Sequence, residues 1–240
     1  SGDPLEYGKL LVGKTILSSK GYGMFVDFYL SGNVIMNIGD GVSARYYNPG
    51  DKVPANYQLL LTFKDESFLV FTVAMYGFIS AYPDAVIDNK YYTISRESIS
   101  PLSDAYTEAE FEKLFAFAKK TLTAKALLAT EQRIPGVGNG VTQDILFNAG
   151  IHPKQKVIDL SDGQKGGLFK SLKDTLMAMT SGRGRDTQTD LYGNEGGYKT
   201  ILSSKTWKNP CPRCGSVIVK EAYLGGSVYY WSERQKIRKT

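Results

Sequence analysis

The sequence predicts an α+β protein in which an antiparallel β-sandwich precedes a helical domain and a C-terminal β-hairpin. Short runs of β-branched and aromatic residues, separated by Gly, Asn, Asp or Pro, fill the first part of the chain. Beyond Pro101 the apolar residues recur at helical spacing, and a Cys-x-x-Cys pair follows soon after Trp207. We therefore expect domains at residues 1–100, 101–206 and 207–240.

Five segments of the first domain have strand character, and turn residues separate them. Lys64–Ser67 has the composition of a hairpin turn between the last two segments. The predicted strands are residues 15–19, 24–30, 33–39, 57–63 and 68–77.

Four helices are predicted in the second domain. Thr107 and Glu110 have capping-box spacing at the start of the first, and residues 123–131 form a short second helix. The third follows Asn139, placed as its N-cap, and stops at Gly150.

A fourth helix and a glycine-rich loop complete the helical domain. The helix is predicted to begin at Ser161, which has capping-box spacing to Gln164. The polar loop that follows covers residues 182–200.

Composition and charge narrow the class of protein. The chain has 240 residues, 42% hydrophobic and 12% aromatic, which is a globular composition without an apolar run long enough to span a bilayer. No signal peptide opens it, and two cysteines are too few for a disulfide-stapled secreted protein, so we expect a cytoplasmic, intracellular location. Residues 1–100 hold 8 basic and 10 acidic side chains, whereas residues 201–240 hold 8 and 2. This asymmetry fits an anionic partner, nucleic acid before membrane, and fits an ordinary solvated surface equally well.

The turn before the third helix is a candidate phosphate site. Its glycines let the backbone approach another molecule closely, and the free N–H groups of a helix start suit an anion. A tight interhelical turn with an ordinary cap is an equally good interpretation of the spacing. The residues concerned are Gly136, Gly138, Asn139 and Gly140, with Lys125 and Arg133 flanking them.

The C-terminal segment contains the first cysteine pair of a zinc site but lacks the second pair. Cys211 and Cys214 have the spacing of a metal-binding knuckle, but Trp231 and Arg234 occupy the positions of a second cysteine pair. Neither is a zinc ligand, and the single histidine, His152, lies in another segment. We therefore expect a hairpin without zinc and no other cofactor, with aromatic side chains replacing the metal: Tyr223, Tyr229, Tyr230 and Trp231.

Two other interpretations of the cysteine pair stay open. A redox-active pair would normally lie in a thioredoxin-like βαβ pattern, which the surrounding sequence lacks. A zinc site could instead be completed by Glu221, by Glu233 or by a second chain, although ligand count favours the hairpin without zinc.

The segments IPGVGNGVTQDILFNAGIHP and CPRCG…GGSVYYW resemble the formamidopyrimidine-DNA glycosylase/endonuclease VIII family, over about Gly8 to Gln235. The resemblance implies a β-sandwich, a helix–two-turn–helix domain and a zinc-finger hairpin, with DNA bound in the cleft between the two parts. Members flip out an oxidised base (formamidopyrimidine, 8-oxoguanine or an oxidised pyrimidine), attack its sugar with an amine, release the base and cut the strand.

The resemblance also implies the partner and several DNA contacts. Asn139 would grip the phosphate beside the lesion, and the loop at 182–200 would fold over the extruded base. Arg234 would point to solvent or to a phosphate. The partner would be damaged or abasic double-stranded DNA, bound by a monomer at the nucleoid. Further contacts implied are Lys125, Arg133, Tyr198 and Lys199.

The family's catalytic residues do not carry over. Its nucleophile is an N-terminal proline followed by a glutamate, whereas this chain opens like the middle of the sandwich, so we expect the opening helix and first strand to be absent. Pro4 is internal, so its nitrogen is an amide. Gly23 takes the catalytic lysine's place, which leaves Lys20 as a substitute. The family's wedge and finger positions hold Asp40, Met75, Tyr76 and Gly226.

These departures leave two functions open. The first is a base-excision glycosylase and AP lyase, an enzyme by resemblance, whose 240-residue chain we expect to be inactive without the N-terminal Pro-Glu pair. The alternative is a non-catalytic member that binds damaged DNA or a DNA structure. An RNA- or ribosome-binding role is disfavoured by the sandwich and the hairpin.

Overall fold

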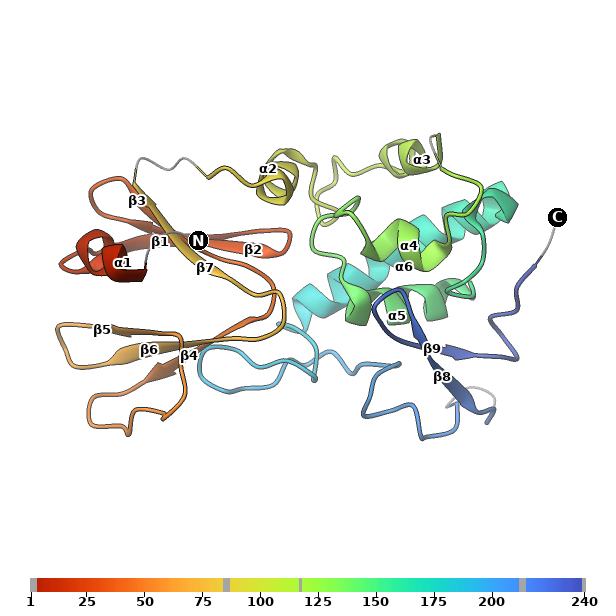
Figure 1. Cartoon of the computed structure of the whole chain (residues 1–240). Helices are drawn as coiled ribbons and strands as arrows, with labels where there is room; N and C mark the ends of the chain where they lie inside the picture. Colours follow the sequence, from red (N-terminus) through yellow and green to blue (C-terminus); the bar gives the residue numbers. More distant parts are fainter. Residues whose placement is uncertain (1–3, 84–86, 117, 212–214, 239–240) are drawn as a thin grey trace. The chain divides into compact units, whose positions relative to one another are not determined.

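The chain folds into two compact units, each with its own core. The computed structural model describes residues 4–83, 87–116, 118–211 and 215–238. One unit comprises Ser1–Glu97 with Thr189–Glu195, and the other comprises Ser98–Gln188 with Gly196–Thr240. Figure 1 shows both, and the class is the mixed α+β class expected, with antiparallel sheets. The three-part division at 100/101 and 206/207 stays a prediction.

The first unit contains two antiparallel sheets in separate layers (Figure 1). One has the order β1-β2-β3-β7 and the other the order β4-β6-β5. Their facing residues share one apolar core, which includes Met36 and Phe71. The strands are β1 (Ile16–Tyr22), β2 (Phe25–Leu30), β3 (Val34–Ile38), β4 (Val42–Tyr47), β5 (Leu59–Thr62), β6 (Phe68–Val73) and β7 (Ile79–Pro83).

Sequence patterning found the strands that are rich in apolar residues and missed two others. The five predicted strands correspond to β1, β2, β3, β5 and β6, and Lys64–Ser67 is the turn that joins β5 to β6. Strand β4 carries Ser43 and Arg45, and β7 ends at a proline, so neither resembles an apolar run. Both are strands because each pairs along its length with a more apolar neighbour, β6 or β3.

Two short helices of the first unit were also missed. Helix α1 (Pro4–Leu11) lies beside β7, and α2 (Lys90–Glu97) lies beside β1. Tyr92 of α2 donates its hydroxyl to the fully buried Asp27 carboxylate at 2.6 Å, and Asn37 Nδ2 donates to the same carboxylate at 2.5 Å. A buried carboxylate of β2 therefore fixes α2 on the outer face of its sheet.

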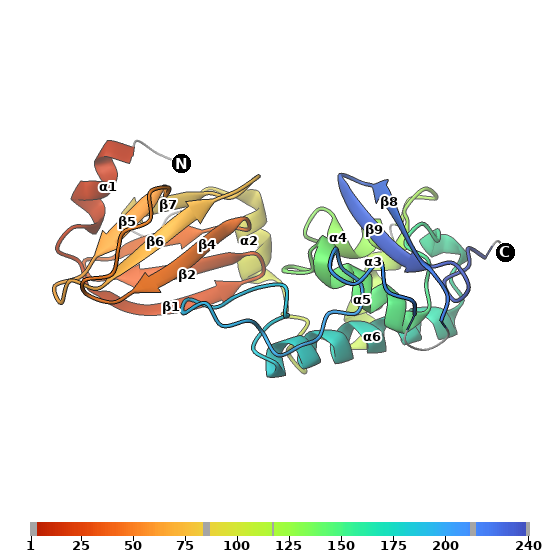
Figure 2. The same ribbon diagram turned by 90° about the horizontal axis from the view of Figure 1, so that it is seen from below.

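The second unit packs four helices and a hairpin around an apolar core that includes Phe111, Leu127, Ile145 and Leu168. Figure 2 shows the long helix α6 running beneath α5. The elements are α3 (Glu108–Ala116), α4 (Ala124–Ala129), α5 (Asn139–Ala149), the 3-10 turn η1 (Val157–Asp159), α6 (Asp162–Ser181), β8 (Ile218–Tyr223) and β9 (Gly226–Trp231).

Local helix signals were confirmed except at one N-terminus. Ser161 and Gln164 form a reciprocal capping box before α6, and Gly150 ends α5 in the left-handed conformation with φ 66°. Asn139 is not the N-cap of α5: that position is Gly138, and Asn139 is the first helical residue. The prediction was wrong by one residue because the asparagine side chain bonds to the hairpin instead of to its own helix.

We expect Ser161→Ala to lower the free energy of unfolding by about 1 kcal/mol, because the capping box loses the side-chain acceptor of the Gln164 N–H. Urea denaturation of the purified chain measures it. Ser98→Ala, at an exposed position at the start of the second unit, is the matched control and should change stability by less than about 0.5 kcal/mol. Equal losses in the two variants would contradict a stabilising capping box.

Candidate nucleic-acid interface

The N-terminus of α5 has backbone donors that no side chain caps. Gly138, the N-cap, is extended with φ −92° and ψ 179°, and it makes no side-chain capping bond. The first N–H groups of a helix have no partner within the helix, and the helix dipole makes that end positive. Gly136, with φ 84°, lets the chain turn sharply into this end. The geometry suits a phosphate group.

Asn139 connects this helix start to the C-terminal hairpin. Its Nδ2 donates to the carbonyl of Ser227 at 3.1 Å. The turn of the hairpin lies close, because a Cβ added at Gly226 would come within 3.3 Å of Asn139 Nδ2. Gly226 has no side chain, so the contact with Asn139 uses the space that a side chain would fill.

Arg185 is a cation at the same helix end that the sequence analysis missed. Its guanidinium lies where a side chain at Gly140 would otherwise project. It also adds positive charge near Asp144 and Tyr198. The only sequence signal was its place in the glycine-rich run GRGRD, which does not indicate that the loop returns to α5.

Tyr198 helps to anchor the glycine-rich loop to Asp144 of α5. Asp144 of α5 is fully buried and accepts the backbone N–H groups of Ile201 at 3.0 Å and Leu202 at 2.8 Å. Burial raises the pKa of Asp144, and the hydroxyl of Tyr198 bonds to the same carboxylate. Burial likewise raises the pKa of Tyr198. The neighbouring Lys199 side chain is 81% exposed, and its Nζ lies 4.0 Å from Asp186 Oδ2.

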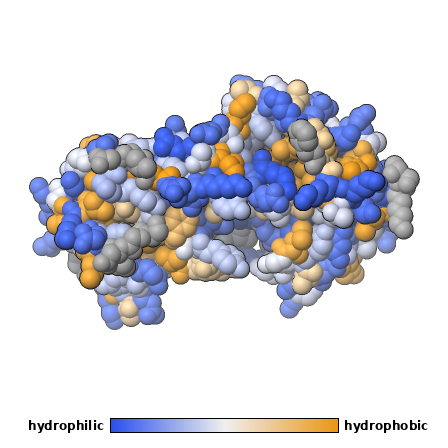
Figure 3. Space-filling view, turned by 45° about the horizontal axis from the view of Figure 1, so that its top comes forward, coloured by the Kyte–Doolittle hydropathy of each residue, from blue (hydrophilic) through white to orange (hydrophobic). Residues whose placement is uncertain are grey.

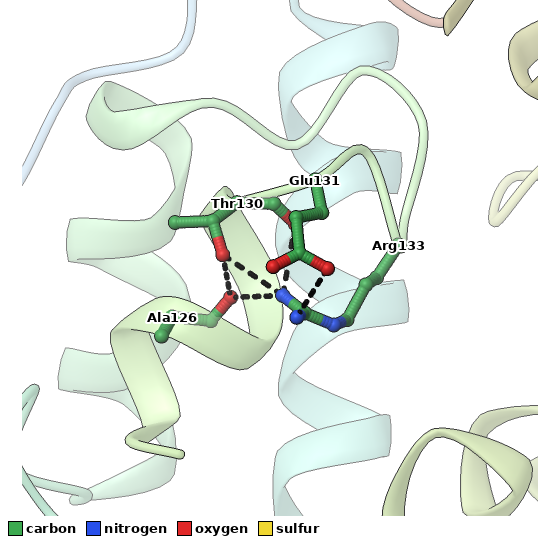
Figure 4. A network of polar contacts seen from close by, with 4 residues as sticks. All are labelled: Ala126, Thr130, Glu131 and Arg133. Atoms are coloured by element: carbon green, nitrogen blue, oxygen red, sulfur yellow. Dashed lines mark hydrogen bonds and ion pairs between the residues drawn. The ribbon is translucent and has the colours of Figure 1, made fainter. Parts of the chain in front are cut away.

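Lys125 and Arg133, expected along a DNA strand, are both engaged inside the unit. Lys125 is 2% exposed, its Nζ donates to the carbonyl of Tyr223, and burial lowers its pKa. Figure 4 shows Arg133 at the end of α4, where Nη1 donates to the carbonyls of Ala126 at 3.0 Å and Thr130 at 3.1 Å. Its Nη2 pairs with Glu131 at 2.7 Å. These two cations therefore hold the hairpin tip and the α4 terminus.

In the first unit, three turns meet at one end of the sheets. Antiparallel pairing brings the β1–β2, β3–β4 and β6–β7 connections together, and they carry Gly23, Asp40 and the pair Met75–Tyr76. Met75 and Tyr76 are 89% and 91% exposed. Gly77 packs directly on the preceding turn, since a Cβ there would lie 2.7 Å from the Gly41 carbonyl carbon. The close contact of two glycine backbones fixes a turn that exposes two large apolar side chains.

Lys20 lies on strand β1 and not in one of these three turns. It is paired with Asp27 in the β1–β2 register, three residues before Gly23. Its Nζ lies 5.0 Å from the centroid of the Tyr22 ring, and the guanidinium carbon of Arg96 lies 5.3 Å from the same centroid. A lysine amine beside an arginine and an aromatic ring is held on the α2 side of the sheet.

The tip of the glycine-rich loop is an ordered turn. Asp190 Oδ1 accepts the backbone N–H groups of Tyr192 and Asn194, each at 2.9 Å. The tip docks on strand β4, where Tyr46 N–H donates to the Leu191 carbonyl at 2.9 Å and Arg45 donates to Asp190 O. The loop therefore carries its own hydrogen bonds.

One of the two cysteines of the half-site lies among the described residues. Cys211 is buried at 3% exposure among apolar side chains, and Cys214 lies outside the described residues. Within the described ranges no three His, Cys, Asp or Glu side chains are grouped so as to hold a metal ion. The helices described there include none long and apolar enough to cross a bilayer.

Known proteins are similar to this chain in fold and, at 25–30% identity, in sequence. No family model matches the chain. The formamidopyrimidine-DNA glycosylase of Mycoplasma mobile is 27% identical over 97% of this chain and 85% of its own length. That of Carboxydothermus hydrogenoformans is 30% identical over 57% of this chain and 52% of its own length.

Solved structures agree in fold. A complex of Lactococcus lactis Fpg with DNA containing an abasic site matches with a TM-score of 0.80 and 21% identity, covering 97% of this chain and 86% of the other. Fpg from Thermus thermophilus matches with a TM-score of 0.77 and 22% identity, covering 96% and 86%. The fold is thus that of a class of α+β proteins with solved DNA complexes. Together, the similarity in sequence and in fold supports the formamidopyrimidine-DNA glycosylase/endonuclease VIII family for this chain.

Replacing Asp144 by alanine should destabilise the second unit by about 2–4 kcal/mol, because two backbone donors and the Tyr198 hydroxyl lose a buried charged acceptor. Denaturant unfolding gives the loss, and hydrogen exchange should show faster exchange at Ile201 and Leu202. Asp174→Ala, on an exposed part of α6, is the control. Unchanged protection of the two amides would mean that Asp144 does not anchor the loop.

Proposed function

We propose that the chain is a DNA-repair protein of the base-excision pathway that binds damaged double-stranded DNA. The observation that carries the proposal is the uncapped N-terminus of α5, beside which Asn139 and Arg185 lie. Backbone donors, a positive helix end and a guanidinium together favour one phosphate of a DNA strand. The similarity to formamidopyrimidine-DNA glycosylases, and to solved structures that hold DNA, supports the choice of DNA over other polyanions.

The charge distribution supports the same partner. Residues 101–240 carry 21 basic and 14 acidic side chains, against 8 and 10 in residues 1–100. On the face shown in Figure 3, hydrophilic residues cover much of the surface and hydrophobic ones are scattered among them. Phosphate contacts from such a surface release counterions, so the affinity should fall steeply as salt is raised.

The lesion to test first follows from the relatives. Complexes of Lactococcus lactis Fpg contain an abasic site, an oxidised pyrimidine or Fapy-dG. We propose oxidised bases and their abasic products as ligands of this chain. In the first unit, Met75 and Tyr76 are candidates to stack on bases beside such a lesion, because apolar and aromatic side chains that enter a duplex replace lost stacking.

Two functions remain to be separated, base removal with strand cleavage and binding without catalysis. Glycosylase and AP-lyase chemistry requires a nucleophilic amine at the sugar C1′. Gly23 has no amine, and Lys20 lies three residues away beside Tyr22 and Arg96. Asp40 at the wedge turn is acidic and would repel a phosphate strand. These positions favour the non-catalytic alternative for the 240-residue chain, and the lesion loop and α5 fit both.

Asn139→Ala should weaken binding to an abasic-site duplex about tenfold, because a phosphate loses a charge-assisted donor. The measurement is fluorescence anisotropy across a salt series, with the folded fraction of each variant fixed by its own unfolding curve. Asn148→Ala, near the other end of the same helix, is the matched control and should bind as the wild type does. The wild-type affinity should fall steeply with salt.

Two results would contradict the DNA contact at α5. One is equal affinity of folded Asn139→Ala and wild type, which would leave Asn139 with its hairpin contact alone. The other is an affinity that stays flat between low and moderate salt, which would exclude phosphate contacts as the main source of binding.

Borohydride trapping on an abasic-site duplex distinguishes the two functions. We expect the 240-residue chain to bind the duplex and to form no covalent complex, since the nitrogen of the internal Pro4 is an amide and Lys20 lies beside Tyr22, near Arg96. Lys20→Met should behave as the wild type does. Efficient trapping that Lys20→Met abolishes would make Lys20 the nucleophile and the chain an enzyme.

A further inference from the structure

The C-terminal hairpin is held on α5 by three side chains spaced four residues apart. Asn139, Gln143 and Phe147 occupy one face of the helix, as residues at this spacing do. Gln143 Nε2 donates to the Ser227 carbonyl at 2.8 Å, and its Oε1 accepts the Tyr229 N–H at 3.0 Å. This amide pairs with the backbone of β9 much as a neighbouring strand would.

Trp231 occupies the centre of the hairpin's apolar cluster. It is fully buried, and its ring centroid lies 3.8 Å from that of Phe147 at an interplanar angle of 87°. Cys211, Ile218 and Tyr229 are buried in the same cluster. The position that would supply a zinc ligand therefore supplies the largest apolar side chain of the hairpin, which accounts for a large buried area.

Gln235 ties the end of the hairpin to the end of α5. It is 1% exposed, its Nε2 donates to the Ile151 carbonyl at 2.8 Å, and its Oε1 accepts the Trp231 N–H at 2.9 Å. Arg234 is exposed, with its guanidinium carbon 5.9 Å from the Phe147 ring centroid. The two positions that a second cysteine pair would occupy thus hold a buried residue, Trp231, and an exposed cation, Arg234.

The residues present do not fit a structural zinc site. Such a site needs four thiolate, imidazole or carboxylate donors in tetrahedral geometry. Glu221, one possible substitute ligand, pairs with Lys154 at 2.7 Å, and Glu233, the other, lies 3.7 Å from Lys236. The only histidine, His152, is buried against the Tyr230 ring, and its Nδ1 accepts the Lys154 N–H. Glu221, Glu233 and His152 therefore each contact another side chain or backbone group already.

We propose that this hairpin is a metal-independent module: contacts with α5 do the structural work that zinc does in a zinc finger. Trp231 with Phe147 supplies the apolar centre, and the amides of Gln143 and Gln235 fix the register of β9. The hairpin turn is thereby held at Asn139 without a metal. Its use in DNA binding rests on the proposed function, whereas its stability without metal does not.

The first experiment measures metal content and stability without DNA. Purified chain should contain well under one zinc atom per molecule by elemental analysis, and excess 1,10-phenanthroline should leave its melting temperature unchanged. Zinc that is removed by the chelator with no change in melting temperature would also support the proposal. One zinc per chain, with the melting temperature falling by more than about 10 °C on chelation, would overturn it.

Two substitutions test which residues hold the hairpin. Trp231→Phe should lower the melting temperature by several degrees while keeping the fold, and Trp231→Ala should lower it by about 10 °C or prevent folding. Cys214→Ser is the control and should melt as the wild type does. A loss for Cys214→Ser as large as that for Trp231→Phe would show a structural role for the cysteine pair and overturn the proposal.

A third experiment measures DNA binding, and it distinguishes the proposed DNA function from the proposed metal-independent hairpin. Affinity for the abasic-site duplex should be the same with and without chelator, and Gln143→Ala should weaken it several-fold while the α-helical signal is kept. If wild-type chain binds no DNA but is zinc-free and chelator-resistant, the DNA function fails and the metal-independent hairpin stands. Binding that is lost on chelation would overturn the hairpin proposal.

Discussion

The second unit depends on the packing of one helix, α5, because its faces contact most of the neighbouring elements. Ile145 and Leu146 lie in the core with α4 and α6, Asp144 binds the backbone of the returning loop, and Phe147 packs on the hairpin. A helix of 11 residues has few positions, so nearly every one is committed, and six consecutive residues from Thr142 are buried. Only its first turn keeps uncommitted backbone donors, and that is where we place a DNA phosphate.

The basic residues that flank the turn before α5 therefore have a structural role that the sequence did not indicate. Lys125 and Arg133 flank it in sequence, but their charges satisfy carbonyl groups of the hairpin tip and of the α4 terminus. Unpaired carbonyls at such places are costly, and a cation with several donors satisfies them well. The cation near the start of α5 is instead Arg185, from a loop more than forty residues further along.

In the first unit, close contact between two backbone segments constrains a turn in a comparable way. Gly41 and Gly77 approach so closely that no Cβ fits at either position. This contact constrains the turn that carries Met75 and Tyr76, which are 89% and 91% exposed. A turn held by backbone contacts has less conformational entropy to lose on binding than an unconstrained loop has.

By itself the sequence determined the features whose signals act within a few residues. The mixed α+β class, five apolar strands, the Ser161 capping box and the Gly150 stop follow from alternation, periodicity and local hydrogen bonding. The motifs around Asn139 also indicated the family. Tertiary structure alone decided features whose partners are distant: strands β4 and β7, which pair with apolar neighbours, and Lys125, whose acceptor lies 98 residues away. It likewise decided that Trp231 meets Phe147, because no local pattern encodes which side chain fills the volume between two elements.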